Sequence, residues 1–311
     1  MIDIKENVSL AELTSFRIGG LAKYFVQIKS LEELKEAINF SRENKIEFYI
    51  IGSGTNLLVN DGVFEGLIIQ MKMNNISVED GLVFAEAGVP LIKAVNFSAC
   101  GGLSGMEQLA GIPGTVGGAV RGNAGAFGTE IRSVVKKVTA LNVENQNIEE
   151  FLNQECGFLY RSSVFKKNKN LIVLSTILEL QKDEVDKVQE KVQETIVKRT
   201  SRGLHGVKSA GSFFMNPVVE NNQKLLDEFE KETGSPARNN TVPAGWLIER
   251  AGLLGKQIGG AQVSPQHANY VINATGTATA ENVIMLVSVI KQQVRDQFGV
   301  QLQEEVNYLG F

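Results

Sequence analysis

The sequence predicts an α+β protein with two domains. The chain has 311 residues, enough for about two domains of roughly 150 residues each. Strand-like and helix-like segments are mixed along it, without the regular alternation that a doubly wound parallel sheet requires. The pattern changes at residues 183–200, where a strand-rich region with many glycines gives way to an amphipathic helix. We therefore expect one domain before this helix and a second domain after it.

The composition is that of a globular protein with no polyanionic or membrane partner. Hydrophobic residues make up 43% and charged residues 21%, which suits a packed core. The net charge is −4 and the basic residues are scattered, so we expect no nucleic acid partner. The longest nearly apolar run, 283–290, is too short to span a bilayer, and no secretory signal pattern is visible. Two cysteines, Cys100 and Cys156, favour a reducing compartment, and we expect a cytoplasmic protein.

Apolar spacing predicts the elements of the first domain. Residues 22–28 predict a strand, and Ser30 with Glu33 forms a capping box that starts a helix over 31–44. Further strands are expected at 48–51, 67–70, 82–87, 134–143 and 171–180, with a helix at 90–100.

Helical spacing and end signals predict the elements of the second part. Apolar residues recur at helical spacing through 183–200, which ends in the cations Lys198 and Arg199, a favourable charge for the helix dipole. We expect this helix to bridge the two domains. Pro243 suits the first turn of a helix at 243–251. The remaining expected elements are a loop at 201–210, a strand at 268–273, a helix at 279–298 and a strand at 305–309.

The most unusual stretch of the chain is the segment 101–128. About a third of it is glycine, yet Leu109, Val116 and Phe127 lie between the glycines, which distinguishes it from a flexible linker. Such a segment is packed while its backbone comes close to something. The simplest candidate is a bound ligand whose phosphates are held by main-chain N–H groups. The alternative is a set of tight turns between buried strands.

A second glycine-rich loop, 52–56, follows a short apolar strand directly. Its sequence Gly-Ser-Gly-Thr-Asn lets successive N–H groups point at a diphosphate, and its two hydroxyls add donors. It matches neither the P-loop nor the dinucleotide fingerprint, so a plain turn at the end of a strand is the alternative. Together, the two loops favour a large ligand that carries phosphates.

Arg161 and Ser212 are candidate catalytic residues. Arg161 lies among apolar residues, where an unpaired guanidinium is costly to bury, so it either grips a carboxylate or forms a structural ion pair. Ser212 lies between a glycine and two phenylalanines; most serines in such places are caps or turns. No histidine is placed for a Ser-His-Asp arrangement, so an active Ser212 would donate a proton rather than attack as a nucleophile.

The remaining polar candidates are less specific. His205 and His267 are the only histidines, and no metal-ligand spacing accompanies them, so we expect no metal site. Glu305 opens the last strand, where a solvated carboxylate is the default. A basic patch either faces solvent or holds an anionic substrate; it comprises Lys198, Arg199, Arg202 and Lys208.

Seven segments in register resemble the UDP-N-acetylenolpyruvoylglucosamine reductase family across essentially the whole chain. They are TSFRIGG (14–20), IGSGTNLLV (51–59), LAGIPGTVGGAV with NAGAFG (109–128), CGFLYRSSVFK (156–166), SAGSFFMNP (209–217), the run 244–273 and EEVNYLG (304–310). The resemblance is to the shorter subtype, which lacks an inserted loop over the substrate. Its N-terminal part is similar to the FAD-binding domain of the p-cresol methylhydroxylase and vanillyl-alcohol oxidase superfamily.

The resemblance implies a two-lobed FAD-binding domain followed by an α+β substrate-binding domain. The implied boundaries are 1–182, with lobes at about 1–72 and 73–182, a bridging helix at 183–200, and 201–311. The last strand, 305–310, would pack back toward the flavin. The resemblance implies an enzyme that uses NADPH to reduce non-covalently bound FAD. The reduced flavin then passes hydride from N5 to the enolpyruvyl ether of UDP-N-acetylglucosamine enolpyruvate. The product is UDP-N-acetylmuramate, a precursor of peptidoglycan, and the expected enzyme is a monomer.

The resemblance also assigns roles to residues of this chain. Arg161 would stabilise negative charge developing on the substrate carboxylate, Ser212 would protonate the α-carbon, and Glu305 would orient the intermediate. The implied substrate-binding residues are Tyr160, Asn216, Gln257 and His267. The implied cofactor-binding residues are Gly52, Ser53, Gly54, Thr55, Asn56, Gly111, Ile112, Pro113, Gly114, Thr115, Gly117, Gly118, Ala119, Asn123, Ala124 and Gly125.

Two positions depart from the family's pattern, and two other readings stay open. Met215 stands where Lys or Arg is common, and Arg121 lies inside the flavin loop where an uncharged residue is common. One alternative function is a flavin oxidase on the same cofactor domain. The other is a non-catalytic nucleotide-binding protein that kept the fold.

Overall fold

The computed structural model describes residues 2–201, 203 and 206–311, and it divides into two compact units. The first unit comprises residues 1–8, 22–54 and 64–201, and the second comprises 9–21, 55–63 and 202–311. These units differ from the expected boundaries because two early segments, 9–21 and 55–63, belong with the C-terminal part. His205 and Arg202 of the sequence predictions lie outside the described residues.

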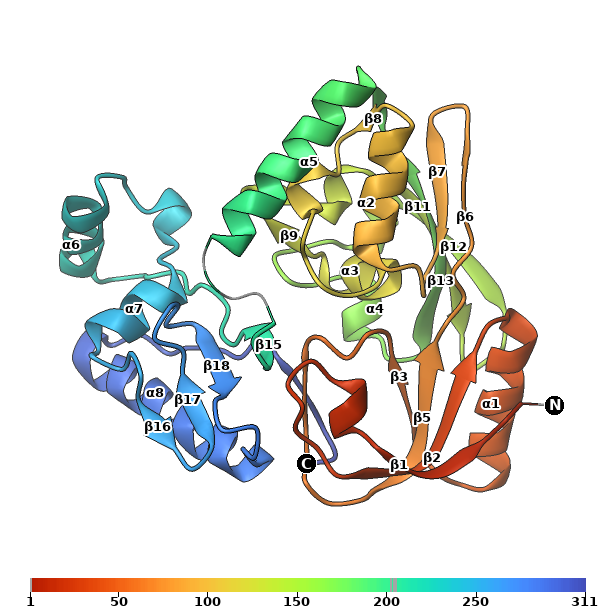
Figure 1. The fold of residues 1–311 in the computed structure, drawn as a ribbon, viewed down its shortest axis with the longest axis horizontal. Helices are drawn as coiled ribbons and strands as arrows, with labels where there is room; N and C mark the ends of the chain where they lie inside the picture. The colour runs from red at the N-terminus through yellow and green to blue at the C-terminus, as the bar shows by residue number, and fades with distance from the viewer. Residues whose placement is uncertain (1, 202, 204–205) are drawn as a thin grey trace. The chain divides into compact units, whose positions relative to one another are not determined.

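The first sheet of the first unit has strand order β1-β2-β5-β3 (Figure 1). Its strands are β1 (Lys5–Ser9), β2 (Leu21–Ile28), β3 (Phe48–Ile51) and β5 (Phe64–Met71), and β5 pairs in parallel with both β2 and β3. Helix α1 (Leu31–Glu43) connects β2 to β3 and buries Leu34 and Ile38. Ser30 caps it by accepting from the Glu33 N–H, whereas the Glu33 carboxylate accepts from Lys29, so the capping box is only half formed.

The second sheet of the first unit is antiparallel, with strand order β12-β11-β13-β7-β6. Its strands are β6 (Ile76–Glu79), β7 (Leu82–Glu86), β11 (Val135–Asn142), β12 (Ile148–Leu152) and β13 (Leu171–Glu179). The central strand β13 is buried along most of its length, as a strand covered on both faces should be. Short pairs complete the unit: β8 (Leu103–Ser104) with β14 (Gln181–Lys182), and β9 (Gly125–Ala126) with β10 (Thr129–Glu130).

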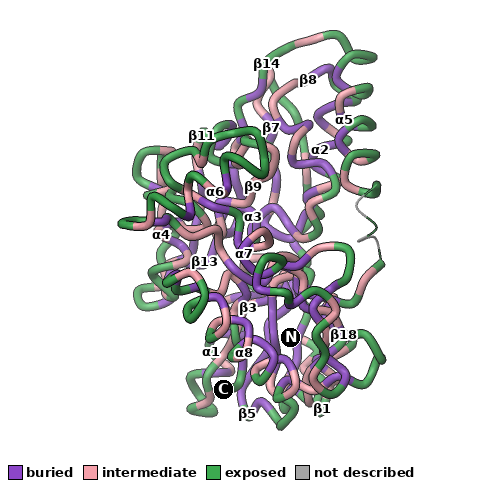
Figure 2. Tube along the Cα trace, turned by 90° about the vertical axis from the view of Figure 1, so that its left-hand side faces the viewer, coloured by how far each residue is buried: buried purple, intermediate pink, exposed green. Residues whose placement is uncertain are grey.

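Helices α2 (Leu91–Cys100), α3 (Val116–Gly122), α4 (Val164–Lys167) and α5 (Val185–Thr200) complete the first unit. Helix α5 lies beside α2 in Figure 1, and its Val188 and Val192 are buried in the same core as α2. Its outer side is exposed, as Figure 2 shows. The helix that we expected to act as a bridge therefore packs as a surface helix of the first unit.

The second unit is built on the antiparallel sheet β15-β18-β17-β16. Its strands are β15 (Ser209–Ser212), β16 (Gln257–Ile258), β17 (Ala261–Val263) and β18 (Tyr270–Asn273). Helices α6 (Gln223–Thr233), α7 (Ala244–Arg250) and α8 (Ala280–Phe298) join it, and Leu247, Leu286 and Ile290 are buried in its core. The final strand β19 (Asn307–Leu309) pairs in parallel with β4 (Leu57–Val59). The mixture of parallel and antiparallel sheets with helices confirms the predicted α+β class.

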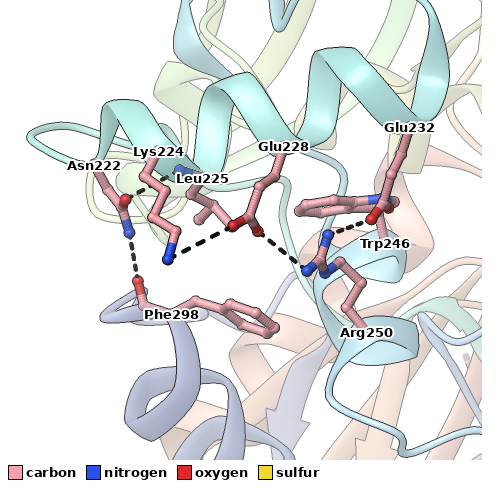
Figure 3. Close-up of polar contacts among 8 residues, drawn as sticks. All are labelled: Asn222, Lys224, Leu225, Glu228, Glu232, Trp246, Arg250 and Phe298. Carbon is pink, nitrogen blue, oxygen red and sulfur yellow. Dashed lines mark hydrogen bonds and ion pairs between the residues drawn. The ribbon is translucent and has the colours of Figure 1, made fainter.

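Helix α6 was not predicted from the sequence, and a polar network attaches it to α7 (Figure 3). Asn222 caps α6 by accepting from the Leu225 N–H at 3.1 Å and donates to the Phe298 carbonyl at 3.0 Å. Arg250 of α7 is paired with both Glu228 and Glu232 and stacks on the Trp246 ring. Exposed pairs contribute roughly 0–1 kcal/mol each, so the buried Leu225 and Phe229 hold the helix more than its charges do.

No helix in the described part of the chain has the length and apolar content needed to cross a bilayer. Among the same residues, no group of three or more His, Cys, Asp or Glu side chains is placed to hold a metal ion.

Candidate functional site

The predicted site residues are divided between the two units. The first unit carries the loop 52–54, the glycine-rich segment 101–128 and the turn that contains Arg161. The second unit carries Thr55, Asn56, Ser212 and Glu305, together with the predicted substrate-binding residues other than Tyr160.

The two glycine-rich loops of the first unit touch each other. A Cβ atom added at Gly52 would lie 2.6 Å from the Thr115 Oγ1, so only glycine permits this approach. The Gly52 carbonyl accepts from the Gln70 Nε2 at 3.2 Å, and Gln70 is buried on β5. In the part of the chain that the structure describes, the N–H groups of Ser53 and Gly54 have no acceptor. Contacts of Gly52 with Gln70 and Thr115 therefore fix the loop, while the N–H groups of Ser53 and Gly54 stay available to a ligand.

The N–H groups of Val116, Gly117, Gly118 and Ala119, at the start of helix α3, donate within the protein. The Val116 and Gly117 N–H groups donate to the Val89 and Ala87 carbonyls at 2.8 and 2.9 Å. The Gly118 N–H donates to Thr115 Oγ1 at 3.3 Å, and the Ala119 N–H to the Thr115 carbonyl at 2.8 Å. A Cβ atom at Gly117 would lie 2.7 Å from that of Ala87. Glycine at position 117 therefore permits the close packing of α3 against Ala87.

The part of the loop before α3 keeps its donors. The N–H groups of Gly111 and Gly114 have no acceptor among the described residues, and both glycines have positive φ, +74° and +135°. The Ile112 N–H donates to the Leu109 carbonyl at 3.2 Å, so Ile112 closes a turn. Pro113 has no N–H to give.

Asn123, Ala124 and Gly125 are bound within the protein. Asn123 is fully buried, with its side chain donating to the Leu159 carbonyl at 2.9 Å and accepting from the Arg132 N–H at 3.3 Å. The Ala124 N–H donates to the Ala119 carbonyl, and Gly125 pairs with Glu130 in the β9–β10 hairpin. The side chain of Asn123 therefore holds the Arg161 turn.

Arg161 lies in a tight turn closed by the Leu159–Ser162 bridge, in a left-handed conformation with φ +54°. Its Nη2 donates to the Gly125 carbonyl at 3.2 Å, and its guanidinium lies 5.2 Å from the centre of the Tyr160 ring. The buried Ser163 donates to the Arg121 carbonyl at 2.7 Å. The turn is thus joined to α3 and β9, and Tyr160 beside it is exposed.

Backbone pairing brings the Ser212 and Glu305 segments together. Ser212 ends β15 opposite Tyr270, after a bulge at which Gly211 has φ +82°. The Glu305 N–H donates to the Phe213 carbonyl at 2.8 Å, and Phe214 bridges Glu304. The two predicted catalytic residues therefore lie on adjacent chain segments of the second unit.

Asn56, predicted to bind the cofactor, lies against the Glu305 segment. Its Nδ2 donates to the Glu305 carbonyl at 3.2 Å, and its own carbonyl accepts from the Asn307 N–H at 3.1 Å. It therefore fixes the start of the last strand.

Met215, which departs from the family's pattern, belongs to the pairing between the 213–215 and 303–305 segments. Its N–H donates to the Gln303 carbonyl at 2.9 Å.

The predicted substrate-binding residues of the second unit are dispersed over it. Asn216 caps the start of α7 by accepting from the Ala244 N–H at 3.0 Å. Gln257 is exposed on β16 and donates to the Gly259 carbonyl at 2.8 Å. His267 accepts at Nδ1 from the Asn269 N–H at 3.2 Å and packs edge-on against Tyr270.

Asn269 and Gln70 were not among the predicted site residues. Both are buried amides, Gln70 on β5 and Asn269 in the turn before β18, and both hydrogen-bond to a segment that carries predicted site residues. An amide within an apolar strand is costly unless its bonds are satisfied, which is a signal that could have identified Gln70. The turn position of Asn269 gives no such signal.

Cations lie on the glycine-rich segment. The Lys198 Nζ and the Arg199 Cζ lie 4.8 and 5.0 Å from the centre of the Phe127 ring. Arg199 also donates to the Gln108 carbonyl at 3.3 Å, and its Cδ would lie 2.8 Å from a Cβ at Gly111. Of the predicted basic patch, Arg199 lies beside Gly111 and Lys198 lies over Phe127, whereas Lys208 belongs to the second unit.

Burial raises the pKa of two tyrosines near these segments. Burial raises the pKa of Tyr49, two residues before the end of β3, although the positive charge of Arg121 acts in the opposite direction. Burial, with the negative charge of Glu304, raises the pKa of Tyr308 on β19 to about 12. Both phenols are therefore neutral hydrogen-bonding groups near pH 7.

The first unit fits a ligand that carries phosphates. Main-chain donors remain at 53, 54, 111 and 114, two loops meet where a side chain would not fit, and cations lie beside Gly111. This is the donor set that a diphosphate requires.

Two family models match separate parts of the chain. Residues 22–149 match an FAD binding domain, and residues 202–309 match the C-terminal domain of UDP-N-acetylenolpyruvoylglucosamine reductase. The first match contains both glycine-rich loops, and the second contains Ser212 and Glu305.

Relatives are similar over nearly the full length. The chain is 40% identical over 309 residues to the UDP-N-acetylenolpyruvoylglucosamine reductase of Carboxydothermus hydrogenoformans, and 38% identical over 309 residues to that of Anoxybacillus flavithermus. Both matches cover 99% of this chain and 94% of the relative. The crystal structure of the reductase from Thermus caldophilus superposes with a TM-score of 0.77 at 28% identity, covering 99% of this chain and 100% of that one. The resemblance found in the sequence is therefore confirmed, and the chain belongs to the UDP-N-acetylenolpyruvoylglucosamine reductase family.

Proposed function

We propose that this protein reduces the enolpyruvyl group of UDP-N-acetylglucosamine enolpyruvate with NADPH and FAD, giving UDP-N-acetylmuramate for peptidoglycan synthesis. The observation that carries the proposal is the sequence identity of 40% and 38%, over 309 residues, to two UDP-N-acetylenolpyruvoylglucosamine reductases. FAD, when bound, accepts hydride from NADPH and delivers it to the enolpyruvyl double bond. We assign cofactor binding to the first unit and sugar binding to the second.

The diphosphate of the cofactor would be held by the loops 52–54 and 111–114. Their available N–H groups and the adjacent Arg199 supply donors and positive charge. Thr115, Gly117, Gly118, Ala119, Asn123, Ala124 and Gly125 would act by shaping these loops. Thr55 continues the loop into the second unit, and Asn56 fixes the last strand.

Arg161 would stabilise the substrate as it accepts hydride. Hydride addition at the β-carbon of an unsaturated carboxylate places negative charge on the carboxylate oxygens, as an enediolate. A guanidinium held in advance stabilises that charge without reorganising. The bond from Arg161 to the Gly125 carbonyl and the ring of Tyr160 restrict the guanidinium in this way.

Ser212 and Glu305 would complete the reaction. The α-carbon of the enediolate is a strong base, so a positioned hydroxyl can protonate it, and we assign this step to Ser212. Glu305 would orient the intermediate through a hydrogen bond. Support for joint action comes from the backbone pairing that places the two segments side by side. We assign contacts with the substrate to Tyr160, Asn216, Gln257 and His267. Asn216 and His267 already accept hydrogen bonds within the protein, so their contribution would be partly structural.

One flavin ring serving two substrates implies alternate binding. We propose ping-pong kinetics with inhibition by excess UDP-sugar, in a cytoplasmic monomer. The visible spectrum of the purified protein tests the function directly. Yellow protein that is bleached by NADPH without oxygen and recoloured by the enolpyruvyl sugar supports the reductase.

Other spectral outcomes would contradict the proposal. A reduced protein that reoxidises rapidly in air and does not respond to the sugar would be a flavin oxidase. A colourless protein that takes up no FAD would be a non-catalytic binding protein.

A further inference from the structure

We propose that Asn269 is a positioning residue that sets where Ser212 and Glu305 lie with respect to each other. Its role in turnover rests on the proposed function. Asn269 immediately precedes β18 and is 4% exposed. Nothing in the sequence motifs distinguishes it, but its hydrogen bonds do.

The bulge in β15 creates the need for such a residue. Ser209 pairs with Ile272 and Ser212 with Tyr270, so three steps along β15 oppose two along β18. The extra residue changes the direction of β15 at Gly211, and the strand ends at Ser212. The next residues, Phe213 and Phe214, are buried and still need partners for their backbone groups.

The side chain of Asn269 supplies those partners. Its Oδ1 accepts from the Phe214 N–H at 2.9 Å, and its Nδ2 donates to the Phe214 carbonyl at 2.8 Å. The Asn269 carbonyl accepts from the Phe213 N–H at 2.7 Å. One amide therefore imitates a strand partner, since it donates to and accepts from the same residue.

The far side of the same segment holds Glu305. The Phe213 carbonyl accepts from the Glu305 N–H at 2.8 Å, and Phe214 bridges Glu304. Phe213 and Phe214 are thus bonded to Asn269 on one side and to the Glu305 segment on the other. Displacing them would move Ser212 and the start of the last strand together.

Asn269 also orients His267. Its main-chain N–H donates to His267 Nδ1, which leaves Nε2 as the nitrogen that carries the proton. The residue therefore fixes three groups that the proposed reaction uses.

Asn273 provides a matched control. It is a second buried amide, at the end of β18 and 5% exposed, with bonds from its Nδ2 to the Phe16 and Arg17 carbonyls and from the Ala278 N–H to its Oδ1. These side-chain bonds stabilise the unit without touching the Ser212 segment; the main-chain bond of Asn273 to the Lys208 carbonyl is kept in the variants. Replacing either asparagine by leucine should lower the melting temperature, whereas only Asn269→Leu should disturb the site.

The experiment compares Asn269→Leu, Asn269→Asp and the same two changes at Asn273. Amide hydrogen exchange at Glu305 and Phe213, which needs no substrate, should speed up in the Asn269 variants alone. In the holoenzyme, bleaching by NADPH should be unchanged, and recolouring by the enolpyruvyl sugar should slow by roughly 10- to 100-fold, mainly in kcat.

Asn269→Asp adds a pH signature. Its carboxylate keeps the acceptor but loses the donor to the Phe214 carbonyl, and protonation restores that donor. Its recolouring rate relative to wild type should therefore rise as the pH is lowered, which a purely structural role would not produce.

Equal exchange protection and equal recolouring rates in the Asn269 and Asn273 variants would overturn the inference. Failure of the wild-type protein to be recoloured by the sugar would instead overturn the proposed function, whatever the variants do. The hydrogen exchange result tests the inference without the proposed function, because it measures the protection of the Glu305 and Phe213 amides and needs no substrate.

Discussion

At the scale of the residue, left-handed backbone occurs in the segments that carry the proposed chemistry, as it does in turns elsewhere in the described chain. Asn123, Phe127 and Arg161 have φ values of +44°, +52° and +54°. Such values are uncommon for residues other than glycine and cost of order 1 kcal/mol each, so surrounding contacts must hold them. Asn123 bonds to the carbonyl of Leu159, which fixes the turn of Arg161. The strained backbone at Asn123, Phe127 and Arg161 is therefore consistent with residues that are selected for their position more than for their contribution to stability.

Ser212→Ala should separate the two half-reactions. Removing the hydroxyl takes away the proposed proton donor and leaves the first unit intact, because Ser212 belongs to the second unit. Bleaching by NADPH should proceed at the wild-type rate, while recolouring by the enolpyruvyl sugar slows by roughly 10²–10⁴-fold. Stopped-flow absorbance measures both phases. Normal turnover of this variant would remove Ser212 from its assigned role.

Arg161→Gln should cost about 3 kcal/mol of transition-state stabilisation if the guanidinium faces the developing charge, or roughly 10²-fold in kcat/KM for the sugar. Arg132→Gln is the control, since Arg132 is a half-exposed arginine of the same unit that pairs with Glu130. Steady-state kinetics of the two variants gives the comparison. An equally small loss in both would make Arg161 a structural residue.

At the scale of the element, α3 shows what local pattern could and could not predict. The strands 22–28, 48–51 and 171–180 and the helix 279–298 follow from apolar spacing, and the structure contains all four within a residue or two. Helix α3 could not be predicted, because glycine is a poor helix former and three of its seven residues are glycine. It forms because Thr115 caps it and the carbonyls of Ala87 and Val89 accept from its first N–H groups.

Gly117→Ala should destabilise the protein by about 1–3 kcal/mol, because the added Cβ would lie 2.7 Å from the Ala87 Cβ and 3.0 Å from its carbonyl oxygen. Gly122→Ala, at the end of the same helix, meets no atom within 4 Å and should be neutral or stabilising by up to about 1 kcal/mol. Urea unfolding of the two variants measures the difference. Equal stability would show that α3 does not need glycine for its packing.

At the scale of the whole molecule, the family and the α+β class could be predicted from the sequence, while the composition of the units could not. Family motifs such as GSGTN and SAGSFF are local, so the sequence displays them directly. The grouping of 9–21 and 55–63 with the C-terminal unit depends on the pairing of β4 with β19 and on the burial of Phe16 and Leu58. No local pattern reports such distant partners, and the roles of Asn123 and Asn269 depend on them in the same way.

Stability of the molecule should fall between about pH 9 and pH 12. Burial, with the negative charge of Glu155, raises the pKa of Cys156 from its ordinary value of 9.0 to about 12. Tyr308 is raised from 10.0 to about 12. A raised acid retains its proton in the folded state, so its stabilisation is complete below the unfolded pKa and is lost as the pH rises through the folded one.

Thiol titration checks this assignment. One thiol, the exposed Cys100, should react with a disulfide reagent at pH 8 in the native protein, and both should react in denaturant. Cys156→Ala should reduce the fall in melting temperature over the alkaline range, compared with wild type and with Cys100→Ala. Rapid reaction of both native thiols would contradict the burial of Cys156.

The pairing of β4 with β19 has a consequence for how the polypeptide matures. Residues 57–59 are synthesised long before their partner strand, 307–309. The fully buried Phe16 and Leu58 belong to a hydrophobic core whose other members nearly all follow residue 209. During translation these early segments must therefore wait without their native cover, which makes them natural sites for chaperone engagement. A gene fragment encoding 202–311 alone would lack them and is a poor choice for independent expression.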